Sequence, residues 1–190
     1  MAKHPKLERY LHVLLRSTHM ERALELAQCA ARLDEVPVGA VVVDSEQRII
    51  AEAHNEMRAR NDATAHAEFL AIGRAMRQMC SSRLEHCDLY VTLEPCTMCA
   101  GAIAHARLRR IYYAAEDVKG GAVDNGVRFF THPSCLHKVE AIGGLYQVRA
   151  EQLLAAFFSR KTPQAREWGL ISGGQDRVHR YRCGIALPPN

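Results

Sequence analysis

Two short motifs constrain this chain more than any other feature. Residues 66–68 read His-Ala-Glu, and residues 95–99 read Pro-Cys-Thr-Met-Cys. Neutral imidazole and cysteine thiolates hold zinc in a tetrahedron, and a catalytic zinc site uses three protein ligands and leaves the fourth position to water. We therefore expect His66, Cys96 and Cys99 to be three zinc ligands that come together in the fold.

Glu68 favours a catalytic zinc over a structural one. It lies two residues after His66, so its carboxylate is close to the metal without being needed as a ligand. Zinc lowers the pKa of a water molecule toward neutrality, and a nearby carboxylate can move protons during the reaction. The alternative is a closed structural site with a fourth ligand such as His105, and that alternative leaves Glu68 without a role.

The order of the two motifs adds specificity. A Cys-x-x-Cys pair alone is weak evidence, because redox-active pairs and structural zinc sites share it. His-x-Glu followed by Pro-Cys-x-x-Cys is the known signature of the zinc-dependent nucleobase deaminases. Both motifs are present here in that order.

Length and charge indicate one domain with additions at both ends. The chain has 190 residues and a formal net charge of +4. We expect an N-terminal extension over residues 1–19 that is a short helix or disordered. A deaminase domain would follow over residues 20–161, and a C-terminal tail of loop or disorder over residues 162–190. Basic residues concentrate in the two ends, which suits either a phosphate backbone or solvated termini.

Nothing in the sequence indicates a membrane or an export route. No apolar run approaches the roughly 20 residues that a spanning helix needs. The N-terminus has a short apolar piece but no small-residue cleavage site. A cytoplasmic protein without a membrane partner is the default expectation.

The spacing of apolar residues predicts alternating strands and helices. Helical spacing covers residues 6–16 and starts again at Met20, and we expect Pro37 to follow the end of that second helix. Two strands over residues 38–43 and 49–53 would form a hairpin. The remaining expectation is a helix through 69–76 with Asp62 or Thr64 as N-cap, strands at 89–93, 110–115 and 139–142, and helices at 96–108 and 146–158. This alternation favours an α/β fold with helices on both faces of one sheet.

Residues around the two motifs resemble one family. They are Glu35-Val36-Pro37-Val38-Gly39-Ala40, Asn55, Thr64-Ala65-His66-Ala67-Glu68, the run from Tyr90 to Ala102, Asp117, Lys119 and Phe157-Phe158. Over about residues 20–161 the chain resembles the bacterial tRNA-specific adenosine deaminases of the cytidine deaminase-like superfamily. The resemblance implies a three-layer α/β/α fold with a five-stranded mixed sheet, in a homodimer. It implies hydrolytic conversion of adenosine to inosine at the wobble position (34) of tRNA anticodons.

The resemblance also implies roles for individual residues. Glu68 would be catalytic, and His66, Cys96 and Cys99 would hold one Zn²⁺ per subunit. The implied substrate-binding residues are Asn55, Val38, Ala67, Asp117, Lys119, His132 and Phe157. Val38 and Phe157 are equally consistent with core positions, and Asp117 with a loop cap.

Two other functions stay open on the sequence. A deaminase of a free nucleobase or nucleoside, of the guanine or cytosine type, would share the metal and Glu68 but need no surface for an anticodon. A zinc-stabilised RNA-binding module without catalysis would bind tRNA and release no ammonia.

Overall fold

The structure is a computed structural model that describes residues 5–160, with side chains from residue 16 onward. The expectations for residues 1–4 and 162–190 lie outside the described residues. In chain order the elements are α1 (Pro5–Arg32), β1 (Gly39–Val43), β2 (Ile49–His54), α2 (Met57–Arg60), α3 (Ala67–Gln78), β3 (Asp88–Leu93), α4 (Thr97–His105), β4 (Arg110–Ala115), the 3-10 helix η1 (Phe129–Thr131), β5 (Glu140–Ile142) and α5 (Gln147–Ser159).

The five strands form one mixed sheet in the order β2-β1-β3-β4-β5. The predicted hairpin is present, with β1 antiparallel to β2 and also to β3. The strands β3, β4 and β5 are parallel to one another. Parallel neighbours need a crossover, and α4 supplies the one between β3 and β4. The expectation of a five-stranded mixed sheet is confirmed.

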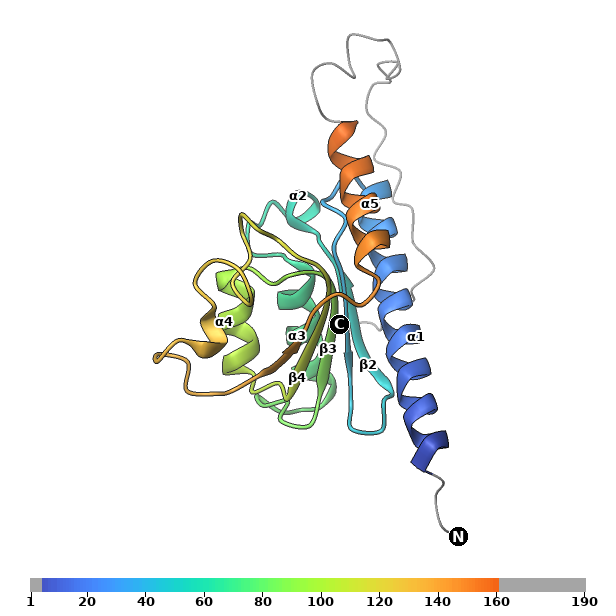
Figure 1. The fold of residues 1–190 in the computed structure, drawn as a ribbon. Helices are drawn as coiled ribbons and strands as arrows, with labels where there is room; N and C mark the ends of the chain where they lie inside the picture. Colours follow the sequence, from blue (N-terminus) through green and yellow to red (C-terminus); the bar gives the residue numbers. More distant parts are fainter. Residues whose placement is uncertain (1–4, 161–190) are drawn as a thin grey trace.

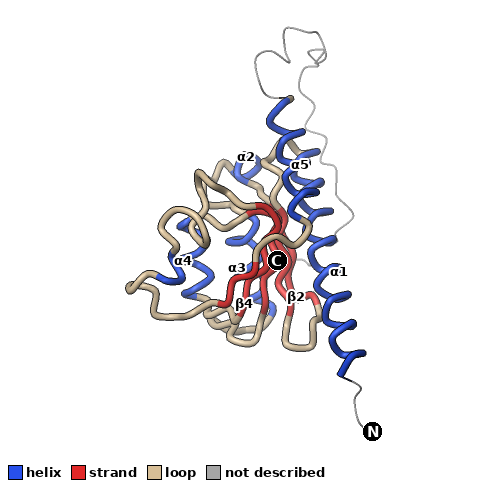
Figure 2. The backbone as a smooth tube through the Cα atoms, in the orientation of Figure 1, coloured by secondary structure: helices blue, strands red, loops and turns tan. Residues whose placement is uncertain are grey.

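Helices cover both faces of the sheet, as Figures 1 and 2 show. Side chains alternate between the faces along each strand, so Leu89 and Val91 point to the side of α3 and α4, whereas Tyr90 points to the side of α1 and α5. The three-layer arrangement expected from the sequence is therefore present. None of the helices in the described part of the chain is long and apolar enough to cross a membrane.

The first helix differs from the expectation of two helical segments. Residues 5–32 form the single helix α1, which extends beyond the sheet at its N-terminal end (Figure 1). The reason is that no glycine or proline separates the two apolar patterns, so nothing interrupts the backbone hydrogen bonds. The helix ends as expected ahead of Pro37, where Asp34 adopts a left-handed conformation.

The strand β1 lies unusually close to α1. A Cβ atom at Gly39 would lie 2.7 Å from the backbone nitrogen of Ala27 and 2.8 Å from Cβ of Leu26. A side chain at Gly39 is therefore excluded by the helix backbone itself. This close contact holds the sheet against α1 beside Val38 and Asn55, where the backbone N–H of Asn55 donates to the oxygen of Val38.

Candidate metal centre and active site

The N-terminal ends of α3 and α4 bring the three predicted ligands together. Nδ1 of His66 lies 3.7 Å from Sγ of Cys96 and 3.6 Å from Sγ of Cys99. His66 is the N-cap residue of α3 and Cys96 is the N-cap residue of α4. The ligand atoms of all three residues lie within 4.8 Å of one another, so the group could hold a metal ion.

These distances fit a tetrahedral zinc ion. With Zn–S near 2.3 Å and Zn–N near 2.0–2.1 Å, tetrahedral angles place a nitrogen and a sulfur ligand about 3.5 Å apart. The two observed N···S distances are close to that value. The positive end of a helix dipole also favours a thiolate near an N-terminus. Hydrogen bonding from Cys99 and His66 lowers the pKa of the Cys96 thiol to about 3.

Glu68 lies in the first turn of α3, and its side chain is buried. Burial disfavours the ionised carboxylate and raises the pKa of Glu68 to about 7. The nearby His66 opposes that shift. A carboxyl group with a pKa near neutrality exchanges protons readily at physiological pH.

The start of α3 is held by Asn55 rather than by the predicted caps. Oδ1 of Asn55 accepts a hydrogen bond of 2.8 Å from the backbone N–H of Ala67. Asp62, one of the two predicted N-caps, instead accepts hydrogen bonds from the backbone N–H and the hydroxyl of Thr64. The cap prediction was therefore wrong, because the acceptor for the first turn comes from the end of β2.

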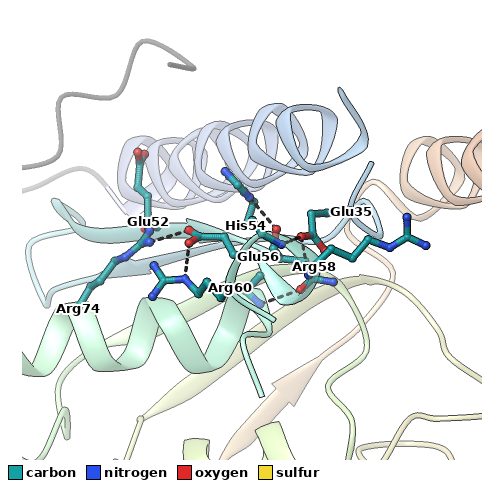
Figure 3. Close-up of polar contacts among 10 residues, drawn as sticks. Glu35, Glu52, His54, Glu56, Arg58, Arg60 and Arg74 are labelled. Carbon is teal, nitrogen blue, oxygen red and sulfur yellow. Dashed lines mark hydrogen bonds and ion pairs between the residues drawn. The ribbon is translucent and has the colours of Figure 1, made fainter. Parts of the chain in front are cut away.

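An ion-pair network holds the segment that leads to His66 (Figure 3). The carboxylate of Glu56 accepts hydrogen bonds from Arg60 at 2.6 Å and from Arg74 at 2.7 Å. Arg74 also donates to the backbone oxygen of Glu52 at 2.6 Å. Since Arg74 belongs to α3, these bonds tie the end of β2 to the helix that begins at His66.

A second buried carboxylate supports the short helix α2. Oε1 of Glu35 accepts hydrogen bonds from the backbone N–H groups of Arg58 and Ala59, at 2.7 and 2.8 Å (Figure 3). These groups have no partner within the helix itself, so Glu35 caps α2 from a distant part of the chain. The side chain of Arg58 forms an ion pair with Asp34, which directly precedes Glu35 in the loop after α1.

The predicted substrate residues on the α3 side are mostly internal. Val38 is 4% exposed and packs in the core between the sheet and α3. Ala67 is fully buried in the same cluster. Asn55 is also buried, and its Oδ1 contacts the backbone of α3.

The remaining predicted substrate residues lie in two other regions. Asp117 and Lys119 belong to the loop after β4, where the carboxylate of Asp117 accepts a hydrogen bond from the backbone N–H of Lys119. His132 is exposed after η1, and its Nδ1 lies 2.7 Å from Oγ of Ser134. Phe157 is buried on α5 and packs edge-to-face with Phe158.

Sequence reasoning missed three supporting groups, namely Glu35, the Glu56–Arg74 pair and Glu94. Glu94 follows β3 directly and is 2% exposed. One signal was available, because a charged residue at the end of an apolar strand is rarely buried unless it is paired. The ion pair between Glu56 and Arg74 gives no comparable signal in the sequence, because the two residues are eighteen positions apart.

Fold and site together define a deaminase with a His-Cys-Cys group that could hold a metal ion, and comparison with known proteins identifies the family. The family model of the MafB19-like deaminases matches residues 16–160. The tRNA-specific adenosine deaminase of Agrobacterium fabrum is 50% identical over 146 residues, which are 77% of this chain and 95% of the relative. The tRNA-specific adenosine deaminase of Rickettsia bellii is 45% identical over 142 residues, which are 74% of this chain and 98% of the relative.

A solved structure agrees with these relatives. It comes from a study of A-to-I editing by tRNA:A34 deaminases at the wobble position of transfer RNA. It superposes with a TM-score of 0.71 at 50% identity, covering 72% of this chain and 99% of that one. The chain belongs to the family of tRNA-specific adenosine deaminases.

Proposed function

We propose that this protein hydrolyses adenosine to inosine at the wobble position (34) of a tRNA anticodon. The observation that carries this proposal is the group of His66, Cys96 and Cys99 with the buried carboxylate of Glu68 beside it. The 50% identity to a tRNA-specific adenosine deaminase supports tRNA as the substrate.

His66, Cys96 and Cys99 would hold one Zn²⁺ per subunit, because their atoms match zinc in type and spacing. When bound, the ion supplies an activated water molecule to the site. The two thiolates and the imidazole leave the fourth position of a tetrahedron to that water, so none of the described residues has to be displaced.

Glu68 would move the protons of the reaction. Its carboxylate takes a proton from the attacking water and delivers it to the ring nitrogen next to C6 of adenine. Oxygen adds at C6 as a hydroxyl group. Glu68 then takes the proton of that hydroxyl and passes it to the amine as the C6–N bond breaks, so that ammonia leaves and a carbonyl remains at C6. One carboxylate thus acts first as base and then as acid. Burial keeps bulk water from supplying or removing that proton.

The substrate base has to leave the stack of the anticodon loop to reach this site. We propose that Asn55 contacts the flipped nucleotide, with Val38 and Ala67 in the wall that receives it. The loop residues Asp117 and Lys119 would contact the RNA backbone near the site. The exposed His132 would lie beside a neighbouring base, as rings do with single-stranded RNA. The buried Phe157 would have to turn outward on binding to lie beside a second base.

Assembly and location are part of the same proposal. A homodimer with active sites near its interface is consistent with the family that the chain belongs to. A tRNA substrate supports a cytoplasmic location for the enzyme. Size-exclusion chromatography with light scattering measures the assembly directly.

The test is a substrate panel with the purified, zinc-loaded protein. The substrates are a tRNA with adenosine at position 34, the same tRNA with guanosine there, and free adenosine, adenine, guanine and cytosine. Inosine and ammonia are measured for each. The proposal expects inosine at position 34 of the first tRNA alone. Ammonia from a free base with unchanged tRNA would replace it with a nucleobase deaminase, and tRNA binding without ammonia would replace it with a binding module.

A further inference from the structure

The carboxylate of Glu94 is the most heavily hydrogen-bonded side chain beside the metal centre. It lies two residues before Cys96 and is 2% exposed. Oε1 accepts hydrogen bonds of 2.9–3.0 Å from the backbone N–H groups of Val123, Asp124 and Asn125. Oε2 accepts from the backbone N–H of Asp117 at 3.0 Å and from Nδ2 of Asn125 at 2.7 Å.

All five partners of Glu94 are donors, so the arrangement requires an acceptor on both oxygens. An ionised carboxylate offers about four lone-pair sites and no donor. A glutamine has nearly the same shape, but its amide nitrogen would face either three donors or two. Replacing one oxygen by nitrogen therefore opposes the whole arrangement without creating a cavity.

These bonds shape a loop that touches a metal ligand. We call residues 117–125 the Glu94 loop. Gly121 in this loop forms a β-bridge with Cys96, and the backbone N–H of Ala122 donates to the oxygen of Pro95 at 2.9 Å. A Cβ atom at Gly121 would lie 2.5 Å from Cδ of Glu94, so only glycine allows the loop this close.

The Glu94 loop also holds an inner turn at Asp117. The carboxylate of Asp117 accepts hydrogen bonds from the backbone N–H groups of Lys119 and Gly120, at 3.1 and 2.9 Å. The backbone N–H of Asp117 in turn donates to Glu94. The position of the exposed Lys119 side chain therefore depends on Glu94 through one chain of hydrogen bonds.

We propose that Glu94 is a positioning residue for substrate, which holds the Glu94 loop against Cys96 so that it presents a preformed contact surface to the anticodon loop. This inference rests on the proposed function, because it assumes that the RNA is bound at this edge. The five hydrogen bonds that the Glu94 carboxylate accepts all come from the Glu94 loop. The effect of Glu94 is on the KM for tRNA, since ordering the loop in advance removes that cost from binding.

The test compares wild type with Glu94→Gln. Zinc content is measured by elemental analysis. The kinetic constants kcat and KM are measured with a tRNA that has adenosine at position 34, and the order of the loop is measured by amide hydrogen exchange. We expect unchanged zinc, a KM raised by about 10- to 100-fold, the range expected when buried donors lose their acceptor, and a smaller change in kcat. Exchange should quicken at Val123, Asp124 and Asn125. Glu116→Gln makes the same change on an exposed side chain just before the loop and should match wild type.

A reversed pair makes the test specific to the hydrogen bonds. Asn125→Asp places a second carboxylate against Glu94 and should raise the KM as well. In the double variant Glu94→Gln with Asn125→Asp, the glutamine amide can donate to the new carboxylate, so part of the loss in KM and in exchange protection should be recovered. If Glu94→Gln does not fold, Asn125→Asp against wild type carries the same comparison.

The outcomes separate this inference from the proposed function. Wild type without activity on tRNA would overturn the proposed function. An active wild type with a Glu94→Gln variant that keeps wild-type KM and loop exchange would overturn the inference alone. Loss of zinc from a folded Glu94→Gln variant would also overturn it, because Glu94 would then act on Cys96 rather than on the loop.

Discussion

Oδ1 of Asn55 accepts a hydrogen bond of 2.8 Å from the backbone N–H of Ala67, the residue between the proposed metal ligand His66 and the buried Glu68. Asn55 follows β2, whereas Ala67 begins α3. The amide side chain therefore sets where the first turn of α3 starts. A residue predicted as a substrate contact thus also orients the two groups that carry the chemistry.

Asn55→Ala should weaken the metal centre as well as the activity. The variant leaves the Ala67 N–H without its acceptor, and loss of a supporting partner of a metal site costs about 10- to 100-fold in affinity or activity. Competition with a zinc chelator measures the affinity. Asn55→Asp is the matched control, since it retains the acceptor while it replaces the side-chain donor by an oxygen and adds a negative charge. Equal zinc affinity in wild type and Asn55→Ala would show that the hydrogen bond does not orient His66.

Gly39→Ala should destabilise the protein through its contact with α1. Its new methyl group would lie 2.7 Å from the backbone nitrogen of Ala27, and helix backbone cannot rotate away. Overpacking of this kind costs typically about 1–3 kcal/mol, occasionally more. Gly73→Ala in α3 is the control, because its nearest neighbour is the end of the Arg77 side chain at 3.6 Å. That substitution should be neutral or stabilise by about 0.4–1 kcal/mol. Urea unfolding of both variants measures the difference.

His19 should make stability depend on pH below neutrality. Both ring nitrogens are buried and have no hydrogen-bond partner among the described residues. Burial lowers the pKa of His19 below its usual 6.5, and the charge of Asp88 opposes this. The unfolded chain therefore binds a proton on this histidine with a pKa of about 6.5, whereas the folded chain binds it only at a lower pH. The free energy of unfolding should fall as pH drops below about 6.5, by up to about 1.4 kcal/mol per pH unit.

The contribution of His19 is isolated by difference, because the ligand His66 also titrates. Unfolding is measured between pH 5 and 8 for wild type, His19→Leu and the exposed control His86→Leu. The dependence of the free energy of unfolding on pH should be weaker in His19→Leu than in wild type, and it should be unchanged in His86→Leu. Equal slopes in all three proteins would mean that His19 binds its proton in the folded state.

Much of the fold could be predicted because apolar spacing and turn residues act locally. The buried run of β1 and the polar turn after it indicate the hairpin without knowledge of any partner. The grouping of His66, Cys96 and Cys99 could be predicted because the two motifs in this order are typical of one kind of zinc site. The single helix α1 was not predicted, since two apolar patterns fit one helix as well as two.

Long-range polar contacts could not be predicted from spacing. Glu94 reaches backbone groups 29–31 residues away, and which amides it meets depends on how the loop after β4 returns to the sheet. The predicted N-cap of α3 was wrong for the same reason, because the sequence offers local acceptors such as Asp62 and does not show that the distant Asn55 supplies the acceptor. A charged residue at the end of a buried strand signals that a partner exists, and only the fold identifies it.

The most direct test of the account is the formation of inosine by Glu68→Ala compared with wild type. Both proteins are loaded with zinc, their metal content is measured, and inosine at position 34 is followed over time in one tRNA. We expect equal zinc contents, full conversion by wild type and no detectable inosine from Glu68→Ala, because that variant lacks the carboxylate proposed to move the protons. Conversion by a zinc-loaded Glu68→Ala variant would contradict the account, and loss of zinc from it would mean that Glu68 supports the metal rather than the chemistry.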